Sequence, residues 1–113
     1  MKSGVDIVFR DIDFSPTLNE QILKKLGKLN RYTDKILNSR VVIDTPHKNK
    51  LKGNLYRASI ELGMSGDIVV AAKDHDSIYV AVRDAFKTIE RKIKERSMRE
   101  RRSRGIISET GAI

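Results

Sequence analysis

The segment from Leu55 to Met64 alternates in polarity, and this alternation constrains the fold more than any other feature of the sequence. Even-numbered positions from Tyr56 to Met64 are apolar, and the odd-numbered positions Arg57, Ser59 and Glu61 are polar. A period of two residues puts the two sets on opposite faces of a β-strand. Such a strand belongs to a sheet that is covered on one face and open to solvent on the other.

Three further segments have the composition of strands in the same sheet. Residues 5–10 put apolar side chains on one face, residues 41–43 are a short apolar run that ends at Pro46, and residues 68–72 form the fourth strand. The polar and basic residues 47–54 predict a hairpin loop, and residues 65–67 (Ser-Gly-Asp) predict a tight turn.

Two segments have the periodicity of helices. The first begins with Ser15 as the N-cap and Pro16 at the first helical position, or with a capping box from Thr17 to Glu20, and continues to about residue 32. Gly27 inside it predicts a close packing contact. The second helix is capped by Asp74 or Asp76 and extends to about residue 101. Residues 105–113 show no periodicity and predict a loose tail.

The order of elements is β-α-β-β-β-α, which predicts an α+β fold. Two helices pack on one face of a four-stranded sheet, with the first two strands parallel and the last three forming an antiparallel meander. The 113 residues fit one domain, with residues 1–95 as the folded domain and residues 96–113 as a basic helical extension and flexible tail.

Positive charge is concentrated in the second helix. The chain has a formal net charge of +8, and residues 83–104 alone hold ten Lys or Arg against four Asp or Glu. A basic excess of this kind favours a polyanionic partner, because Lys and Arg that neutralise phosphates release condensed counterions.

The basic residues are also ordered around each helix. At about 100° per residue, one stripe of the second helix lies nearly opposite its apolar face, and a second stripe lies on the first helix, with one lysine at its apolar border. Like charges spaced along one face repel unless a polyanion binds them, although a charged face is also typical of a solvated helix. Aromatic residues are 5% of the chain, which favours recognition of structured RNA through its backbone. The predicted RNA-binding residues are Lys24, Lys25, Lys28, Arg31, Arg83, Lys87, Arg91 and Lys94.

The sequence favours a binding protein over an enzyme. His75 lies between Asp74 and Asp76, but acidic residues at a helix start are explained by capping, so we predict no catalytic residue, no metal site and no cofactor. There is no cysteine, which excludes disulfides and thiolate zinc sites. No apolar run is long enough to span a membrane and no signal-peptide pattern is present, so we expect a cytoplasmic protein without a membrane partner or a small-molecule substrate.

Two long segments carry a resemblance to a known family. Residues 15–32 (SPTLNEQILKKLGKLNRY) and residues 76–93 (DSIYVAVRDAFKTIERKI), separated by strands, resemble the short form of the ribosome hibernation-promoting factor and ribosome-associated inhibitor family. Residues 28–32 match the end of the family's first helix, except that Asn30 replaces a glutamate. In the second helix Lys92 replaces a glutamine, and Lys87 precedes Thr88 where the family commonly has Asp-Lys.

The resemblance implies a fold akin to double-stranded-RNA-binding domains. It also implies binding to the 70S ribosome, at small-subunit rRNA in the channel for mRNA and tRNA, with translation blocked in stationary or stressed cells. It carries over Lys25, Lys28, Arg31 and Arg91 as contacts, whereas Arg83, Lys87 and Lys94 come from the stripe pattern alone. The alternatives are a protein-binding modulator of transcription, a general structured-RNA-binding protein, and an RNA-processing enzyme that uses His75 and Asp76.

Overall fold

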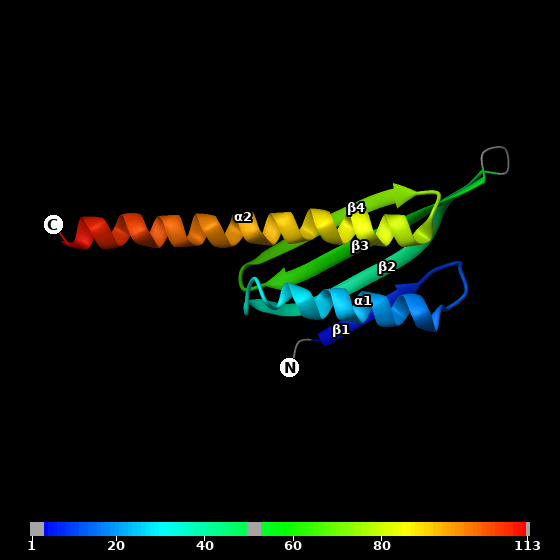
Figure 1. Cartoon of the computed structure of the whole chain (residues 1–113), viewed down its shortest axis with the longest axis horizontal. Coiled ribbons are helices and arrows are strands. Elements are labelled where there is room, and N and C mark those ends of the chain that lie inside the picture. The colour runs from blue at the N-terminus through cyan, green and yellow to red at the C-terminus, as the bar shows by residue number, and fades with distance from the viewer. Residues whose placement is uncertain (1–3, 50–52, 113) are drawn as a thin grey trace.

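The structure is a computed structural model that describes residues 4–49 and 53–112; for residues 46–49, 53–54 and 100–112 it describes the backbone alone. The predicted order of elements is confirmed (Figure 1). The elements are β1 (Gly4–Phe9), α1 (Pro16–Leu29), β2 (Ile36–Asn49), β3 (Gly53–Met64), β4 (Asp67–His75) and α2 (Ile78–Ala112).

The four strands form one sheet in the order β1-β2-β3-β4. β1 pairs with β2 in parallel, and the other two pairings are antiparallel, as the sequence predicts. One row of partners runs straight across the sheet, from Val8 to Val42, then Ser59 and Ala72. This register places successive rows of side chains on alternate faces of the sheet.

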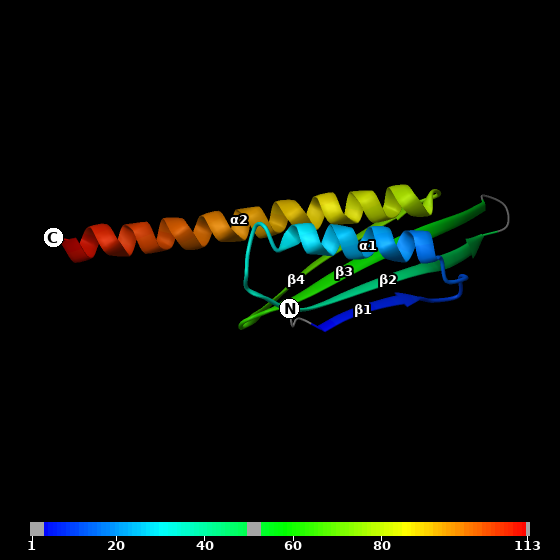
Figure 2. The ribbon, with the colours of Figure 1, turned by 60° about the horizontal axis from the view of Figure 1, so that its bottom comes forward.

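Both helices cover the same face of the sheet (Figure 2). The alternation in β3 is confirmed, because Ala58, Ile60, Leu62 and Met64 are buried beneath the helices, whereas the side chain of Glu61 is exposed on the other face. Burying a large aliphatic side chain contributes roughly 1.5–3 kcal/mol, so the apolar stripes of the helices hold them on the sheet. The helical contribution to this core is Leu18, Ile22, Leu26 and Leu29 from α1, and Ala81, Val82, Ala85, Phe86, Ile89 and Ile93 from α2.

A hairpin joins β2 and β3 as predicted, but both strands are longer than predicted, and the predicted bounds of its loop, residues 47–54, are too wide. His47, Lys48 and Asn49 pair with Leu55, Asn54 and Gly53, and only residues 50–52 of that loop lie outside the described residues. The register shifts between Asp44 and His47, around a proline that has no backbone N–H to donate. The extra pairs rest on backbone hydrogen bonds and need no apolar pattern, so hydropathy did not reveal them. The tight turn that follows β3 is confirmed, with Met64 paired to Asp67 and Gly66 at a φ of 74°.

The predicted N-cap of α1 is confirmed, and the predicted N-cap of α2 is wrong. Ser15 caps α1, with its Oγ accepting a hydrogen bond from the Leu18 N–H at 3.2 Å, and Pro16 is the first helical residue. Asp74 and Asp76 do not cap α2. Instead the Ser77 Oγ accepts from the Val80 N–H at 3.4 Å, because β4 continues through Asp74 to His75 and displaces the helix start.

Two expectations for α1 are also wrong. The space around Gly27 is open, since a Cβ there would have no atom within 4 Å, and the residue lies on the exposed face of the helix. The helix ends at Leu29 with Asn30 as its C-cap, and a tighter turn follows in which the Arg31 and Tyr32 N–H groups donate to the carbonyls three residues earlier. Arg31 therefore lies beyond the helix on which it was predicted.

The helix α2 extends beyond the sheet (Figure 1). Among the residues of α2 whose side chains the structure describes, up to residue 99, the last buried one is Ile93. Beyond it, the Arg96 Nε lies 3.3 Å from the Asp67 carboxylate, and the Ser97 Oγ donates a hydrogen bond to the Tyr32 carbonyl. The loose tail predicted for residues 105–113 is wrong as far as Ala112, because the helix continues to that residue. No proline interrupts this part of the sequence, so the backbone groups of the helix can pair with one another. This pairing does not require a buried face, and so it leaves no hydrophobic period in the sequence.

Candidate nucleic-acid interface

The helices α1 and α2 lie side by side, and a groove of about 220 Å³ separates their exposed faces. Lys25 and Lys28 line it from α1, and Arg83 and Lys87 line it from α2. We call this feature the interhelical groove. It is built from the two stripes, since each pair of cations is one helical turn apart on the side of its helix that faces the other helix.

The floor of the groove is apolar, and its walls are charged. Leu29 and Phe86 line the bottom and are almost fully buried, so they fix the separation of the helices. Lys28 and Lys87 are exposed, whereas Lys25 is half-buried at the border of the core, where its aliphatic stem covers apolar surface. The Arg83 Nε lies 3.4 Å from the carboxylate of Asp84, and Asp84 itself does not line the groove.

One end of the groove is closed by a polar cluster of Tyr32, Glu90 and Lys94. The Lys94 Nζ lies 3.2 Å from the Glu90 carboxylate and 4.6 Å from the centre of the Tyr32 ring. Hydrogen bonds from the Tyr32 hydroxyl and from Lys94, and the charges of Lys94 and Lys28, hold the pKa of Glu90 below its ordinary value. The same bond to Glu90 and the neighbouring Tyr32 raise the pKa of Lys94. The cluster therefore stays charged at neutral pH and fixes Lys94 in place.

This arrangement suits the binding of phosphate groups. Four cations converge on the open part of the groove, and ammonium and guanidinium groups position a nucleic-acid backbone without reading its sequence. Base stacking has little support here, because Phe86 is buried and the Tyr32 ring is already covered by Lys94.

The family model described as "Sigma 54 modulation protein / S30EA ribosomal protein" matches residues 5–101. The chain belongs to this family. The S30EA family is non-enzymatic, which agrees with the prediction that the chain is not an enzyme.

A curated relative in the S30EA family is the ribosome hibernation promotion factor of Deinococcus radiodurans. It is 31% identical over 96 residues, which cover 81% of this chain and 49% of the relative. The chain thus spans about half the length of that relative.

Two solved structures share the fold. The N-terminal domain of Thermus thermophilus Protein Y superposes with a TM-score of 0.69 at 23% identity, covering 83% of this chain and 98% of that one. A ribosomal subunit interface protein from Coxiella burnetii gives a TM-score of 0.68 at 21% identity, covering 84% and 98%. The predicted fold class is confirmed.

The structure brings together only part of the predicted RNA-binding set. Lys25, Lys28, Arg83 and Lys87 line the interhelical groove, and Lys94 closes its end. The other three, Lys24, Arg31 and Arg91, are exposed and do not line the groove.

Sequence reasoning missed the roles of Tyr32 and Glu90. A weak signal exists for each: Tyr32 follows Lys25 by seven residues, and Glu90 precedes Lys94 by four, the spacing of a favourable helical ion pair. Neither spacing reveals that the two residues meet across two different elements.

The residues considered for catalysis lie where β4 ends and α2 begins. The His75 Nδ1 accepts a hydrogen bond from the Ser77 N–H at 2.9 Å and lies 2.9 Å from the Asp76 carboxylate, next to the start of α2. Among the side chains that the structure describes, in residues 4–45 and 55–99, no group of three or more from His, Asp and Glu is placed to hold a metal ion. No helix in the described part of the chain is long and apolar enough to cross a membrane.

Proposed function

We propose that this member of the S30EA family is a ribosome-associated factor that binds small-subunit rRNA through the interhelical groove. It would occupy the channel for mRNA and tRNA and so keep idle 70S ribosomes inactive in the cytoplasm of stationary or stressed cells. The observation that carries the proposal is the convergence of Lys25, Lys28, Arg83 and Lys87 on one groove. The names of the Deinococcus radiodurans and Coxiella burnetii proteins support the ribosome as the partner.

The remaining predicted residues have a place in this proposal. Lys24, Arg31 and Arg91 flank the groove as exposed cations, and Lys94 marks its closed end. They would extend the cationic surface along the RNA backbone, where each neutralised phosphate adds to the salt dependence of binding. In this proposal the domain predicted over residues 1–95 would make the interaction, and the basic residues 96–113 would extend from it.

Two double variants with the same change of net charge test the groove. K28E/K87E reverses one cation on each wall, and K24E/R91E reverses one exposed flanking cation on each helix. We expect K28E/K87E to weaken small-subunit binding at least about a hundredfold, because phosphates at the groove lose two contacts and meet two carboxylates. We expect K24E/R91E to weaken it about tenfold or less, because these flanking cations do not converge on the groove and each contributes less than a groove cation does.

The measurement is co-sedimentation with purified 30S and 50S subunits over a salt series. The proposal holds if the chain binds 30S subunits, if log affinity falls steeply with log salt, and if this slope is shallower for K28E/K87E. Equal losses for the two variants would show that the surface acts as diffuse charge. Binding that survives nuclease treatment and high salt would point to a protein partner and overturn the proposal.

A further inference from the structure

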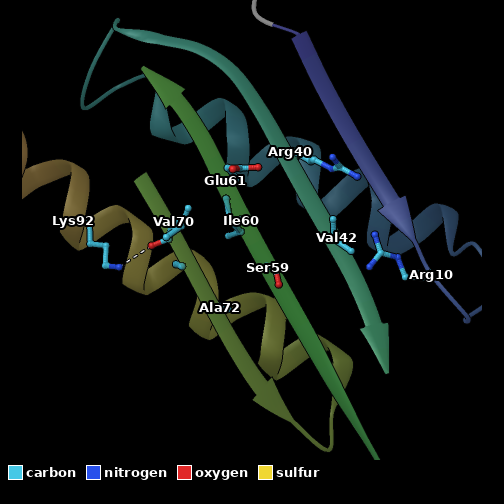
Figure 3. Close-up of a pocket in the computed structure, with 10 residues that line it drawn as sticks. Arg10, Arg40, Val42, Ser59, Ile60, Glu61, Val70, Ala72 and Lys92 are labelled. Carbon is cyan, nitrogen blue, oxygen red and sulfur yellow. Dashed lines mark hydrogen bonds between the residues drawn. The ribbon is translucent and has the colours of Figure 1, made fainter. Parts of the chain in front are cut away.

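The sheet face opposite the helices has an ordered arrangement of side chains that the interhelical groove does not use (Figure 3). A hollow of about 480 Å³ lies over this face. Along the middle of this sheet face, the cross-strand register aligns one largely apolar row of side chains, which we call the central row. The central row consists of Val8 on β1, Val42 on β2, Ser59 on β3 and Ala72 on β4. Beside it, Val70 is 50% exposed.

A first charged row lies on one side of the central row. Asp6, Arg40 and Glu61 are register partners on β1, β2 and β3, and the Arg40 Nε lies 3.8 Å from the Asp6 carboxylate. At β4 the row is completed by Lys92 of α2, whose Nζ donates to the Val70 carbonyl at 2.7 Å. From β1 to β4 the charges alternate as minus, plus, minus, plus.

A second charged row lies on the other side, with the opposite order of signs. Arg10 follows β1 and lies 3.9 Å from the Asp44 carboxylate of β2. Asp44 pairs in register with Arg57, and Arg57 makes two hydrogen bonds to Asp74 of β4, at 2.7 and 3.0 Å. From β1 to β4 the charges are plus, minus, plus, minus.

The two rows together carry four positive and four negative side chains, so their charges cancel, in contrast to the basic helix layer. A neutral face does not attract a polyanion. An apolar centre between rows of charged residues has instead the anatomy of a protein–protein interface.

The order of the charges selects the partner. Consider a two-fold axis parallel to the strands that passes between β2 and β3. With the axis in the plane between the two facing sheets, β1 lies over β4 of the second copy and β2 lies over β3. Each row that runs across the strands therefore faces the same row of the second copy in reverse order. Because each charged row alternates in sign across four strands, reversal puts every positive side chain opposite a negative one. The central row meets itself too, with Val8 over Ala72 and Val42 over Ser59.

We propose that this sheet face is a self-association surface and that its partner is a second copy of this chain. Two sheets would pack face to face with their strands nearly aligned, as in aligned β-sandwiches, and the contact would be isologous, as in most two-fold dimers. Both interhelical grooves would remain exposed, because the helices cover the opposite face of each sheet (Figure 2). Self-association is thus separable from the proposed function.

A charge swap within one ion pair tests the pattern. The variant R57D/D74R keeps an Asp–Arg pair between β3 and β4 and leaves the net charge unchanged. It changes the second charged row to plus, minus, minus, plus, so that reversal puts like charges opposite each other at all four strands. We expect the dissociation constant of the dimer to rise at least about tenfold, because each like-charge juxtaposition opposes association. The measurement is sedimentation equilibrium of the full chain over a wide concentration range at low salt.

A second swap supplies the matched control. Adding R10D/D44R to R57D/D74R restores alternation as minus, plus, minus, plus, and we expect dimerisation to return to within about threefold of the unaltered chain. Far-UV circular dichroism confirms that each variant is folded. If a swapped variant does not fold, A72K places a charge in the central row at an exposed position, and it should likewise raise the dissociation constant at least about tenfold.

Three results would overturn the proposal. The unaltered chain could remain monomeric at every concentration, its dimer could be insensitive to R57D/D74R and A72K, or the face could bind a different protein while the chain stays monomeric. Binding of R57D/D74R to 30S subunits, measured in parallel, should be unchanged. This comparison distinguishes a failure at the sheet face from a failure of the interhelical groove.

Discussion

At the scale of single residues, Glu90 is the carboxylate at the closed end of the interhelical groove. Its hydrogen bonds to Tyr32 and Lys94 keep it charged, and it offsets part of the repulsion between Lys94 and Lys28. Glu90 thus stabilises the fold while it reduces the positive potential available to phosphates at that end. The two roles lead to opposite effects when the charge is removed.

The variant E90Q separates the role of Glu90 in stability from its effect on the positive potential of the groove. Because the folded-state pKa of Glu90 lies below its ordinary value of 4.5, the stability that it contributes is present above that pH and is lost as pH falls through the folded-state pKa. We therefore expect thermal denaturation to show E90Q slightly less stable than the unaltered chain at neutral pH, with the difference disappearing in acid. RNA affinity at neutral pH should rise. Parallel pH profiles for the two proteins would contradict this assignment.

Gly27 gives a second prediction at this scale. It lies on the exposed face of α1, where an added Cβ meets no atom within 4 Å. We expect G27A to stabilise the protein by about 0.5–1 kcal/mol, because alanine loses less backbone entropy than glycine in a helix. Chemical denaturation checks this value, and unchanged 30S binding would show that the substitution leaves the neighbouring groove intact. A destabilised G27A would contradict the open space at this position.

At the scale of elements, α2 is divided by its packing. Its first part, to Ile93, buries an apolar stripe. Ser97 still donates a hydrogen bond to the Tyr32 carbonyl, and Met98 is already 53% exposed. Helix beyond this point is held by its own backbone hydrogen bonds, and such helices are marginal without tertiary packing. The extension should therefore contribute little to the stability of the domain.

A truncation after Ser97 tests this division. We expect the thermal midpoint of the truncated chain to change by no more than about 2 °C, although the helical circular dichroism signal falls. The substitution I93A is the comparison, and it should destabilise the full chain by about 2–5 kcal/mol, because Ile93 is fully buried. A large loss of stability on truncation would show that residues 98–113 pack on the domain.

The same division explains which elements could be predicted from the sequence. The strand over residues 55–64 and the packed parts of both helices were predictable, because burial of one face imposes a period on the residues. The paired ends of β2 and β3 and the helix beyond Ser97 were not, since the backbone hydrogen bonds that form them impose no period on hydropathy. The start of α2 was assigned to the wrong residue because Asp74, Asp76 and Ser77 are all good N-caps, and only the length of β4 decides among them.

For the site, the sequence predicted the cations and not their grouping. Periodicity placed Lys28 and Lys87 on exposed stripes, and the packing of α1 against α2 then brought them to one groove. The same packing left Arg91 outside that groove. The cluster of Tyr32, Glu90 and Lys94 joins residues from a turn and a helix that are far apart in the sequence, so no local pattern could reveal it.

At the scale of the whole molecule, the two layers differ in charge. The chain has a net charge of +8, the charged rows on the open sheet face sum to zero, and the exposed cations of the proposed RNA surface lie on the helix layer. An uneven distribution of this kind gives the molecule an electric dipole across its thickness. In the field of a polyanion, a dipole experiences a torque as well as an attraction. The molecule would therefore turn its helices toward the polyanion before any contact forms, and more of its diffusional encounters would begin in a productive orientation.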